Sequence, residues 1–199
     1  DKPALVCRWR MSNKKVPMLN RHIRALSERL VQGEPLTHNM LSWAKQHVEW
    51  SLAEGDYTAH DGVLMLVLDI NGNAAMTVGE YEPLADTSAK ALRARSAEAR
   101  SEADETGVAP ELLAAVNNGE LAFVAPADEC LCGTATLIEQ LAQTKGIPVT
   151  RVDIPAQLKG ALFLVSDEHG VVPATETDAA EADAATVAFF ADGYEKLRA

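Results

Sequence analysis

The sequence predicts an α/β protein, and three observations lead to that prediction. Segments with strand periodicity and segments with helical periodicity follow one another along the whole chain. The length of 199 residues suits one large domain or two small lobes that share a core. Hydrophobic residues make up 47% of the chain, which is enough to bury a sizeable core.

The first part of the chain is expected to hold three strands and two helices. A helical spacing of apolar residues predicts a helix over 16–31, and Thr37 is a good cap for a second helix that ends at Gly55. The nearly continuous apolar run over 62–70 predicts a central strand buried on both faces. Asn71-Gly72 is a typical hairpin turn. The predicted strands are 5–11, 62–70 and 74–81.

The second part begins with an Ala-, Arg- and Glu-rich helix over 86–104, which Gly107 closes. Asn117-Asn118-Gly119 predicts a second hairpin. The remaining predicted strands are 112–116, 120–124, 147–152, 161–165 and 171–175, and the remaining helices are 134–145, the short 155–159, and about 178–197.

Charge and cysteine content narrow the classes of function. The formal net charge of −11 argues against a nucleic-acid or anionic-membrane surface and fits a protein that handles small molecules. Three cysteines make neither a disulfide framework nor a zinc site, so we expect reduced thiols and a cytoplasmic location. The chain contains no apolar run of transmembrane length. It has no glycine-rich phosphate motif, and without an HExxH pattern no metal site is predicted.

Four local patterns occur in a characteristic order. They are VPMLNRHIRAL at 16–26, then Glu102-Ala103 followed by Thr106-Gly107 and a strand, then LCGTATL at 131–137 with GIPV at 146–149, and finally FLVSDEHGVVP at 163–173. In this order they resemble the class IV aminotransferase family, the fold-type IV group of pyridoxal-phosphate enzymes that includes aminodeoxychorismate lyase. The likeness extends over almost the whole chain.

The resemblance implies a two-lobe architecture, with a small N-terminal lobe over 1–83 and a C-terminal lobe over 84–199. It implies a site between the lobes, near the interface of a homodimer. The cofactor would be pyridoxal phosphate and the substrate an amino acid or amino-carboxylate, with transamination or elimination as the reaction. Lys90 would be the catalytic lysine, and Ser166 and His169 would lie near the substrate.

The resemblance also implies that Gly133, Thr134 and Thr136 would hold the cofactor's phosphate. The residues themselves allow this role, because backbone N–H groups, two hydroxyls and the helix dipole meet at the N-terminus of the predicted helix. The same residues also suit an ordinary threonine cap.

The sequence departs from the family pattern at several points. The arginine expected after His22 falls on Ala25, and Lys90 lies in a segment that has the composition of an exposed helix rather than a strand end. Three interpretations therefore stay open: a divergent aminotransferase or lyase, a family relative that has lost the cofactor and acts as a small-molecule-binding or assembly protein, and an unrelated α/β protein.

Overall fold

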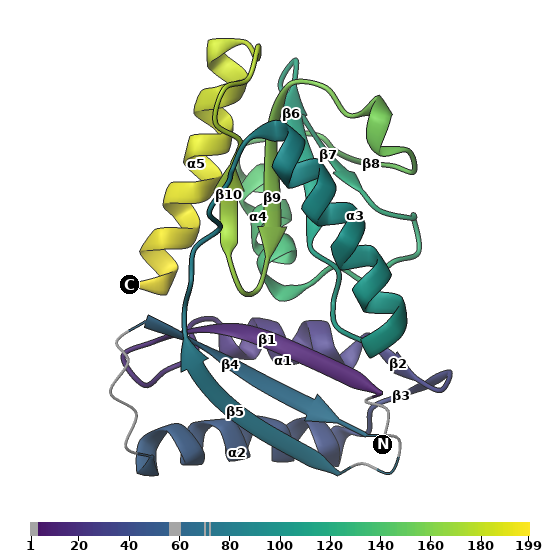
Figure 1. Ribbon diagram of the computed structural model, residues 1–199, viewed down its shortest axis with the longest axis vertical. Helices are drawn as coiled ribbons and strands as arrows, with labels where there is room; N and C mark the ends of the chain where they lie inside the picture. The colour runs from purple at the N-terminus through teal and green to yellow at the C-terminus, as the bar shows by residue number, and fades with distance from the viewer. Residues whose placement is uncertain (1–3, 56–60, 70, 72) are drawn as a thin grey trace.

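The computed structural model describes residues 4–55, 61–69, 71 and 73–199. Its elements form two lobes, each built on its own sheet (Figure 1). In the small lobe the elements are β1 (Leu5–Ser12), α1 (Leu19–Ser27), β2 (Leu30–Val31), β3 (Glu34–Pro35), α2 (His38–Glu54), β4 (Asp61–Leu68) and β5 (Ala74–Glu80). In the large lobe they are α3 (Ala89–Thr106), β6 (Leu112–Asn117), β7 (Glu120–Val124), α4 (Gly133–Thr144), β8 (Val149–Val152), a short 3₁₀ turn η1 (Pro155–Gln157), β9 (Ala161–Ser166), β10 (Gly170–Pro173) and α5 (Glu181–Arg198).

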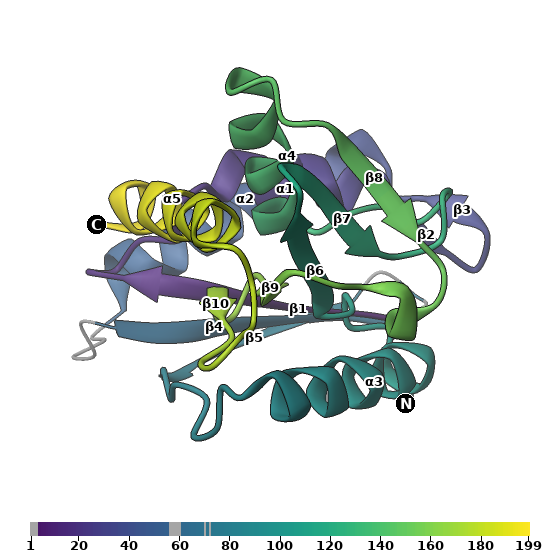
Figure 2. The same cartoon turned by 90° about the horizontal axis from the view of Figure 1, so that it is seen from above.

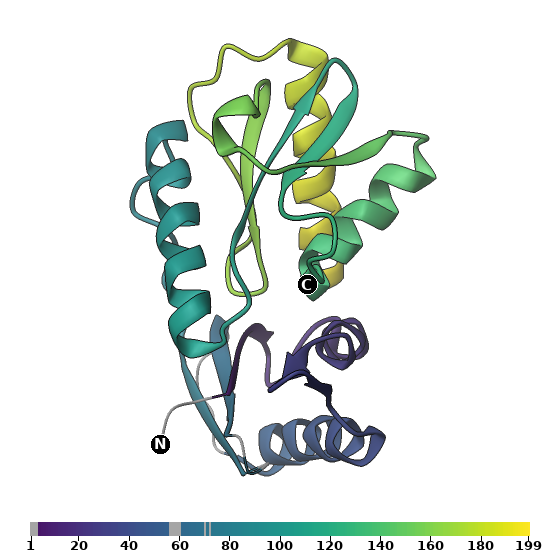
Figure 3. The same ribbon diagram turned by 90° about the vertical axis from the view of Figure 1, so that its right-hand side faces the viewer.

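The small lobe is an antiparallel sheet of order β1-β4-β5 with α1 and α2 packed on one face. Figure 3 shows both helices on the same side of the strands. The expectation that β4 is buried on both faces was wrong. Its residues alternate between buried and half-buried, because the helices cover only one face of this sheet. The Asn71-Gly72 turn that joins β4 to β5 lies partly outside the described residues.

The large lobe is a five-stranded sheet of order β10-β9-β6-β7-β8 between two layers of helix. Figure 2 shows α3 on one face of this sheet, with α4 and α5 on the other. Alternate residues of β6 enter two separate cores: Ala114 packs with α4 and α5, whereas Leu113 and Ala115 pack on the α3 side. The strands β6 and β9 are apolar except for their last residues, Asn117 and Ser166, and their apolar residues are buried on both faces, as their sequences require.

The predicted helix over 16–31 is shorter in the structure. It begins only at Leu19, because Met18 has a left-handed backbone (φ 60°), and it ends at Ser27. Leu30 and Val31 pair with β3 instead. Gln32 and Gly33 both have positive φ, the conformation of a two-residue hairpin turn, so the turn chemistry overrides the helical spacing.

The first strand ties the lobes together. At one end of β1 the Val6 N–H donates to the Gly107 carbonyl (3.1 Å), and at the other the Arg10 N–H donates to the Asp167 carbonyl (3.0 Å). Among the described residues, no helix is long and apolar enough to cross a membrane.

Candidate functional site

A cavity of about 60 Å³ lies between the lobes, where the family resemblance places a site. Elements from both lobes line it: β1, α1, the C-terminal half of α3, and the loops that precede β6, precede α4 and follow β9. Its charged lining consists of two arginines, Arg8 and Arg29, and four carboxylates, Glu102, Glu111, Asp167 and Glu168. Carboxylates therefore outnumber cations in this lining.

The N-terminus of α4 holds the three residues predicted to bind phosphate. Both the backbone N–H and the hydroxyl of Thr134 donate to the same carboxylate oxygen of Asp167, each at 2.9 Å. The Thr136 hydroxyl donates to the Gly133 carbonyl (2.6 Å) and accepts from Arg21 (3.2 Å). The anion at this helix N-terminus is therefore the carboxylate of Asp167, a residue of the same chain.

His22 completes the surroundings of that carboxylate. Its Nδ1 lies 3.5 Å from the Asp167 Oδ1 and makes no hydrogen bond, while the ring is buried and stacks on Trp9. Burial lowers the pKa of His22, and the charge of Asp167 opposes that effect. A Cβ on Gly133 would lie 2.5 Å from this Nδ1, so only glycine allows the imidazole to approach α4 so closely.

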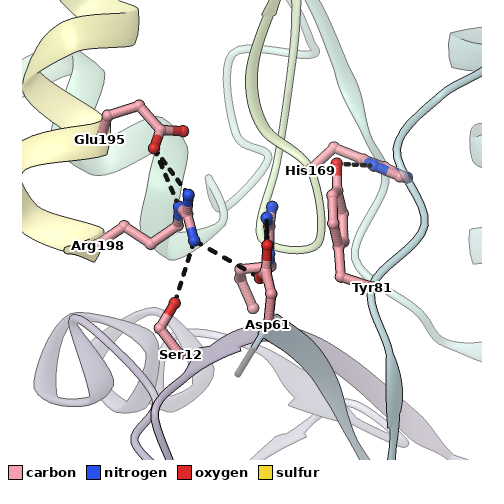
Figure 4. Close-up of polar contacts among 7 residues, drawn as sticks. Ser12, Asp61, Tyr81, His169, Glu195 and Arg198 are labelled. Atoms are coloured by element: carbon pink, nitrogen blue, oxygen red, sulfur yellow. Dashed lines mark hydrogen bonds and ion pairs between the residues drawn. The ribbon is translucent and has the colours of Figure 1, made fainter. Parts of the chain in front are cut away.

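Ser166 and His169 lie near this position but form contacts of their own. The Ser166 hydroxyl accepts from the His169 N–H (2.9 Å). The His169 Nδ1 is 2.9 Å from the Tyr81 hydroxyl, which Figure 4 shows reaching up from the small lobe. Arg95 lies 3.2 Å from the Nε2 and can only donate. The network thus assigns the proton to Nδ1, with Tyr81 as its acceptor.

The Arg95 guanidinium lies among three groups that could otherwise bind a metal ion. Glu111, Glu168 and His169 place one ligand atom each within 4.8 Å of one another. Arg95 binds both carboxylate oxygens of Glu111, at 2.6 and 2.9 Å, and also contacts His169. Glu168 is left with a pKa raised mainly by burial. Arg95 thus supplies the positive charge that a metal ion would otherwise bring to this cluster.

A second polar group joins the lobes at the far end of β1. Arg198, from the last turn of α5, donates to the Ser12 hydroxyl at 3.1 Å and lies 3.5 Å from Asp61 (Figure 4). Arg10 binds both oxygens of Asp61 at 2.6 Å and lies over the Tyr81 ring. Sequence reasoning missed these contacts because each joins residues far apart in the chain.

Comparison with known proteins finds similar structures but no similar sequence. No family model matches the sequence, and no curated protein matches it significantly. Solved structures do match. A protein from Thermotoga maritima, provisionally assigned as a branched-chain amino acid aminotransferase, matches with a TM-score of 0.66 at 15% identity, over 98% of this chain and 86% of that one. The chain has the class IV aminotransferase fold.

Two further matches carry the same fold. One, provisionally assigned as a 4-amino-4-deoxychorismate lyase, matches with a TM-score of 0.64 at 14% identity, over 94% of this chain and 88% of that one. The other is the pyridoxal phosphate-bound form of a hypothetical aminotransferase from Mycobacterium tuberculosis. It matches with a TM-score of 0.58 at 11% identity, over 96% and 89% of the two chains.

Lys90, the predicted catalytic lysine of this class IV fold, lies exposed in the first turn of α3. Glu102, which lines the cavity between the lobes, is twelve residues further along the same helix, or about 18 Å at 1.5 Å per residue. Among the described residues, no lysine lines this cavity. Thr134 contacts Asp167, which follows Ser166 in the chain, whereas Lys90 lies apart, so the catalytic role of Lys90 stays a prediction.

Pyridoxal phosphate does not fit the residues present at the inter-lobe site in this arrangement. Ligand pockets typically measure roughly 300–1,000 Å³, well above the 60 Å³ found here. The helix N-terminus that would meet a phosphate already binds the Asp167 carboxylate. The described lining also offers no lysine amine to attack a carbonyl carbon.

His169 is expected to make stability depend on pH. Burial lowers its pKa from 6.5 to about 4. Between those values the unfolded chain takes up a proton that the folded protein does not, so the free energy of unfolding falls as the pH falls from 6.5 toward 4. Urea denaturation across this range should show a weaker dependence in His169→Gln. Equal pH dependence in both proteins would contradict the assignment.

Proposed function

We propose that this protein is a class IV aminotransferase-fold relative that works without covalently bound pyridoxal phosphate, as a binding or assembly protein. The observation that carries the proposal is that Asp167 fills the anion position at the N-terminus of α4. We include the homodimer that the family resemblance implies as part of the proposal.

The described lining of the inter-lobe cavity contains no lysine that could form an imine with the cofactor, and this supports the proposal. A lysine forms an imine only as the neutral amine, which requires an environment that lowers its pKa, such as burial or a neighbouring cation. Lys90 is exposed on a helix surface and does not line the inter-lobe cavity.

The size of the inter-lobe cavity argues against the binding of a large ligand between the lobes. A space of about 60 Å³ accommodates a few water molecules. On the outer helix of the small lobe, by contrast, Trp43 and Trp50 are 44% and 65% exposed, one heptad apart. Large exposed aromatic side chains are typical of protein interfaces rather than of free surfaces. Their position supports an interaction surface on α2.

The competing function is a divergent aminotransferase or lyase for an amino acid or amino-carboxylate. The pyridoxal phosphate-bound aminotransferase among the matched structures favours it at the level of the fold. It would require Lys90 to reach the cofactor and Asp167 to leave the α4 N-terminus. This enzyme and the cofactor-free protein differ in a single measurable property, stoichiometric attachment of the cofactor to one lysine.

The test combines visible absorbance with borohydride trapping. Purified protein is incubated with pyridoxal phosphate, reduced, and measured by intact mass and peptide mapping, alongside Lys90→Ala and the control Lys159→Ala, which removes another exposed lysine. We expect no aldimine band and only partial labelling spread over several lysines. One cofactor per chain, lost in Lys90→Ala and kept in Lys159→Ala, would establish the enzyme instead. Light scattering on the same sample gives the oligomeric state.

A further inference from the structure

The first turn of α4 is capped from a distance. Cys132 occupies the N-cap position and its side chain makes no capping hydrogen bond. The cap is provided by Asp167, from the turn after β9, which accepts two hydrogen bonds from Thr134. We propose that Asp167 is a built-in occupant of an oxyanion site formed by the α4 N-terminus and His22, and that it excludes inorganic phosphate and phosphate monoesters from that site.

The unpartnered Nδ1 of His22 is the second observation that marks an anion position. A buried polar atom normally has a hydrogen-bond partner, and leaving it without one is costly. This atom is fully buried, has no hydrogen bond, and faces the Asp167 carboxylate at 3.5 Å. That separation is too long for a hydrogen bond, and a ligand with more oxygen atoms than a carboxylate could satisfy this nitrogen as well as Thr134.

A further cation adds to the positive potential at this position. Arg29 is largely buried, and burial lowers its pKa. The negative charge of Asp167 is among the nearby charges that partly offset this lowering. Its guanidinium donates to the Gly107 carbonyl at 2.7 Å. Glu102, Glu111 and Glu168 also line the cavity, but Arg8 and Arg95 bind the first two. Glu168 is the carboxylate that opposes a second anion.

The side chain of Asp167 can be removed without loss of its main-chain contacts. Its carbonyl accepts the Arg10 N–H from β1, and that bond does not involve the carboxylate. Substitution at 167 therefore empties the oxyanion site while the lobes stay tied together at this point. The inference deepens the proposed function, because it states why a phosphate is excluded. It does not depend on whether Lys90 reacts.

The experiment measures phosphate binding to full-length Asp167→Ala by ³¹P NMR line width, at constant ionic strength. The matched control is Asp167→Asn, which keeps the size of the side chain and an acceptor oxygen but not the charge. We expect saturable binding to Asp167→Ala with a Kd at least tenfold lower than for the wild type, and no such gain in Asp167→Asn. Adding His22→Gln to Asp167→Ala should weaken the binding severalfold.

Two results would overturn the inference. One is phosphate binding of equal strength in the wild type and all variants, and the other is a folded Asp167→Ala that gains no binding. If Asp167→Ala does not fold, Asp167→Ser, which keeps a hydroxyl acceptor for Thr134, replaces it under the same criteria. Lysine labelling by pyridoxal phosphate is read separately, so failure of the proposed function is distinguishable from failure here.

Discussion

Gly170→Ala is expected to destabilise the protein by about 2–5 kcal/mol. Gly170 has a φ of +71°, and a left-handed backbone costs an ordinary residue about 1–2 kcal/mol. An added Cβ would also collide with the ring of Tyr194, which α5 holds buried against the start of β10. Overpacking of this kind typically costs about 1–3 kcal/mol. Urea denaturation followed by circular dichroism measures the loss.

Gly119→Ala is the matched control for this prediction. Gly119 has a similar φ of +77°, but a Cβ there meets nothing within 4 Å. That variant should lose the backbone contribution alone, and the difference between the two isolates the collision with Tyr194. Equal losses would mean that α5 moves aside, and that the turn carrying Asp167 is less firmly held than the structure indicates.

Trp9→Ala is expected to cost about 3–5 kcal/mol, the usual range for removal of a buried large aromatic side chain. Trp9 is 2% exposed and stacks on His22, with ring centroids 5.3 Å apart and planes 7° apart. Its loss would leave a void beneath the imidazole and remove the surface that keeps Nδ1 facing α4. Denaturant midpoints and slopes, compared with those of the wild type, give the change in the free energy of unfolding.

Ile154→Ala provides the control for Trp9→Ala. It removes an apolar side chain from a position that is 53% exposed and lies outside the surface proposed on α2, where substitutions usually change stability by no more than about 0.5 kcal/mol. A similar loss in both variants would contradict the assignment of Trp9 to the core between β1 and α1.

Local chemistry predicted most of the elements. Thr37 caps α2 through a bond from the Met40 N–H, and Gly107 ends α3 with a left-handed backbone, as their residue types indicate. The helix predicted to reach residue 31 ends early for a reason that is also local. Gln32 and Gly33 form a tight turn, and this turn overrides the helical spacing of the apolar residues. These outcomes depend on neighbours within a few residues, which a sequence displays directly.

The occupant of the α4 N-terminus could not be predicted in the same way. The sequence indicated that Gly133, Thr134 and Thr136 suit an anion, but Asp167 is 33 residues from Thr134 and reaches it only through the order of the five-stranded sheet. Likewise, the composition of α3 suggested that Lys90 is exposed, whereas the distance from it to the cavity required the position of the whole helix. The residues at a helix end can be recognised in the local sequence, whereas a capping side chain from a distant part of the chain cannot.

The hydrogen bonds of β1 to the large lobe have a consequence for the order of synthesis. Arg10 is made before the carbonyl that it binds, which belongs to Asp167, 157 residues later. At about 5–20 residues per second, the ribosome needs roughly 8–30 s to cover that interval. During that time the edge of β1 that bonds to the large lobe, and the face of α1 that packs on α4, have no complete partner lobe. The nascent small lobe thus presents an unpaired strand edge to chaperones until the last third of the chain emerges.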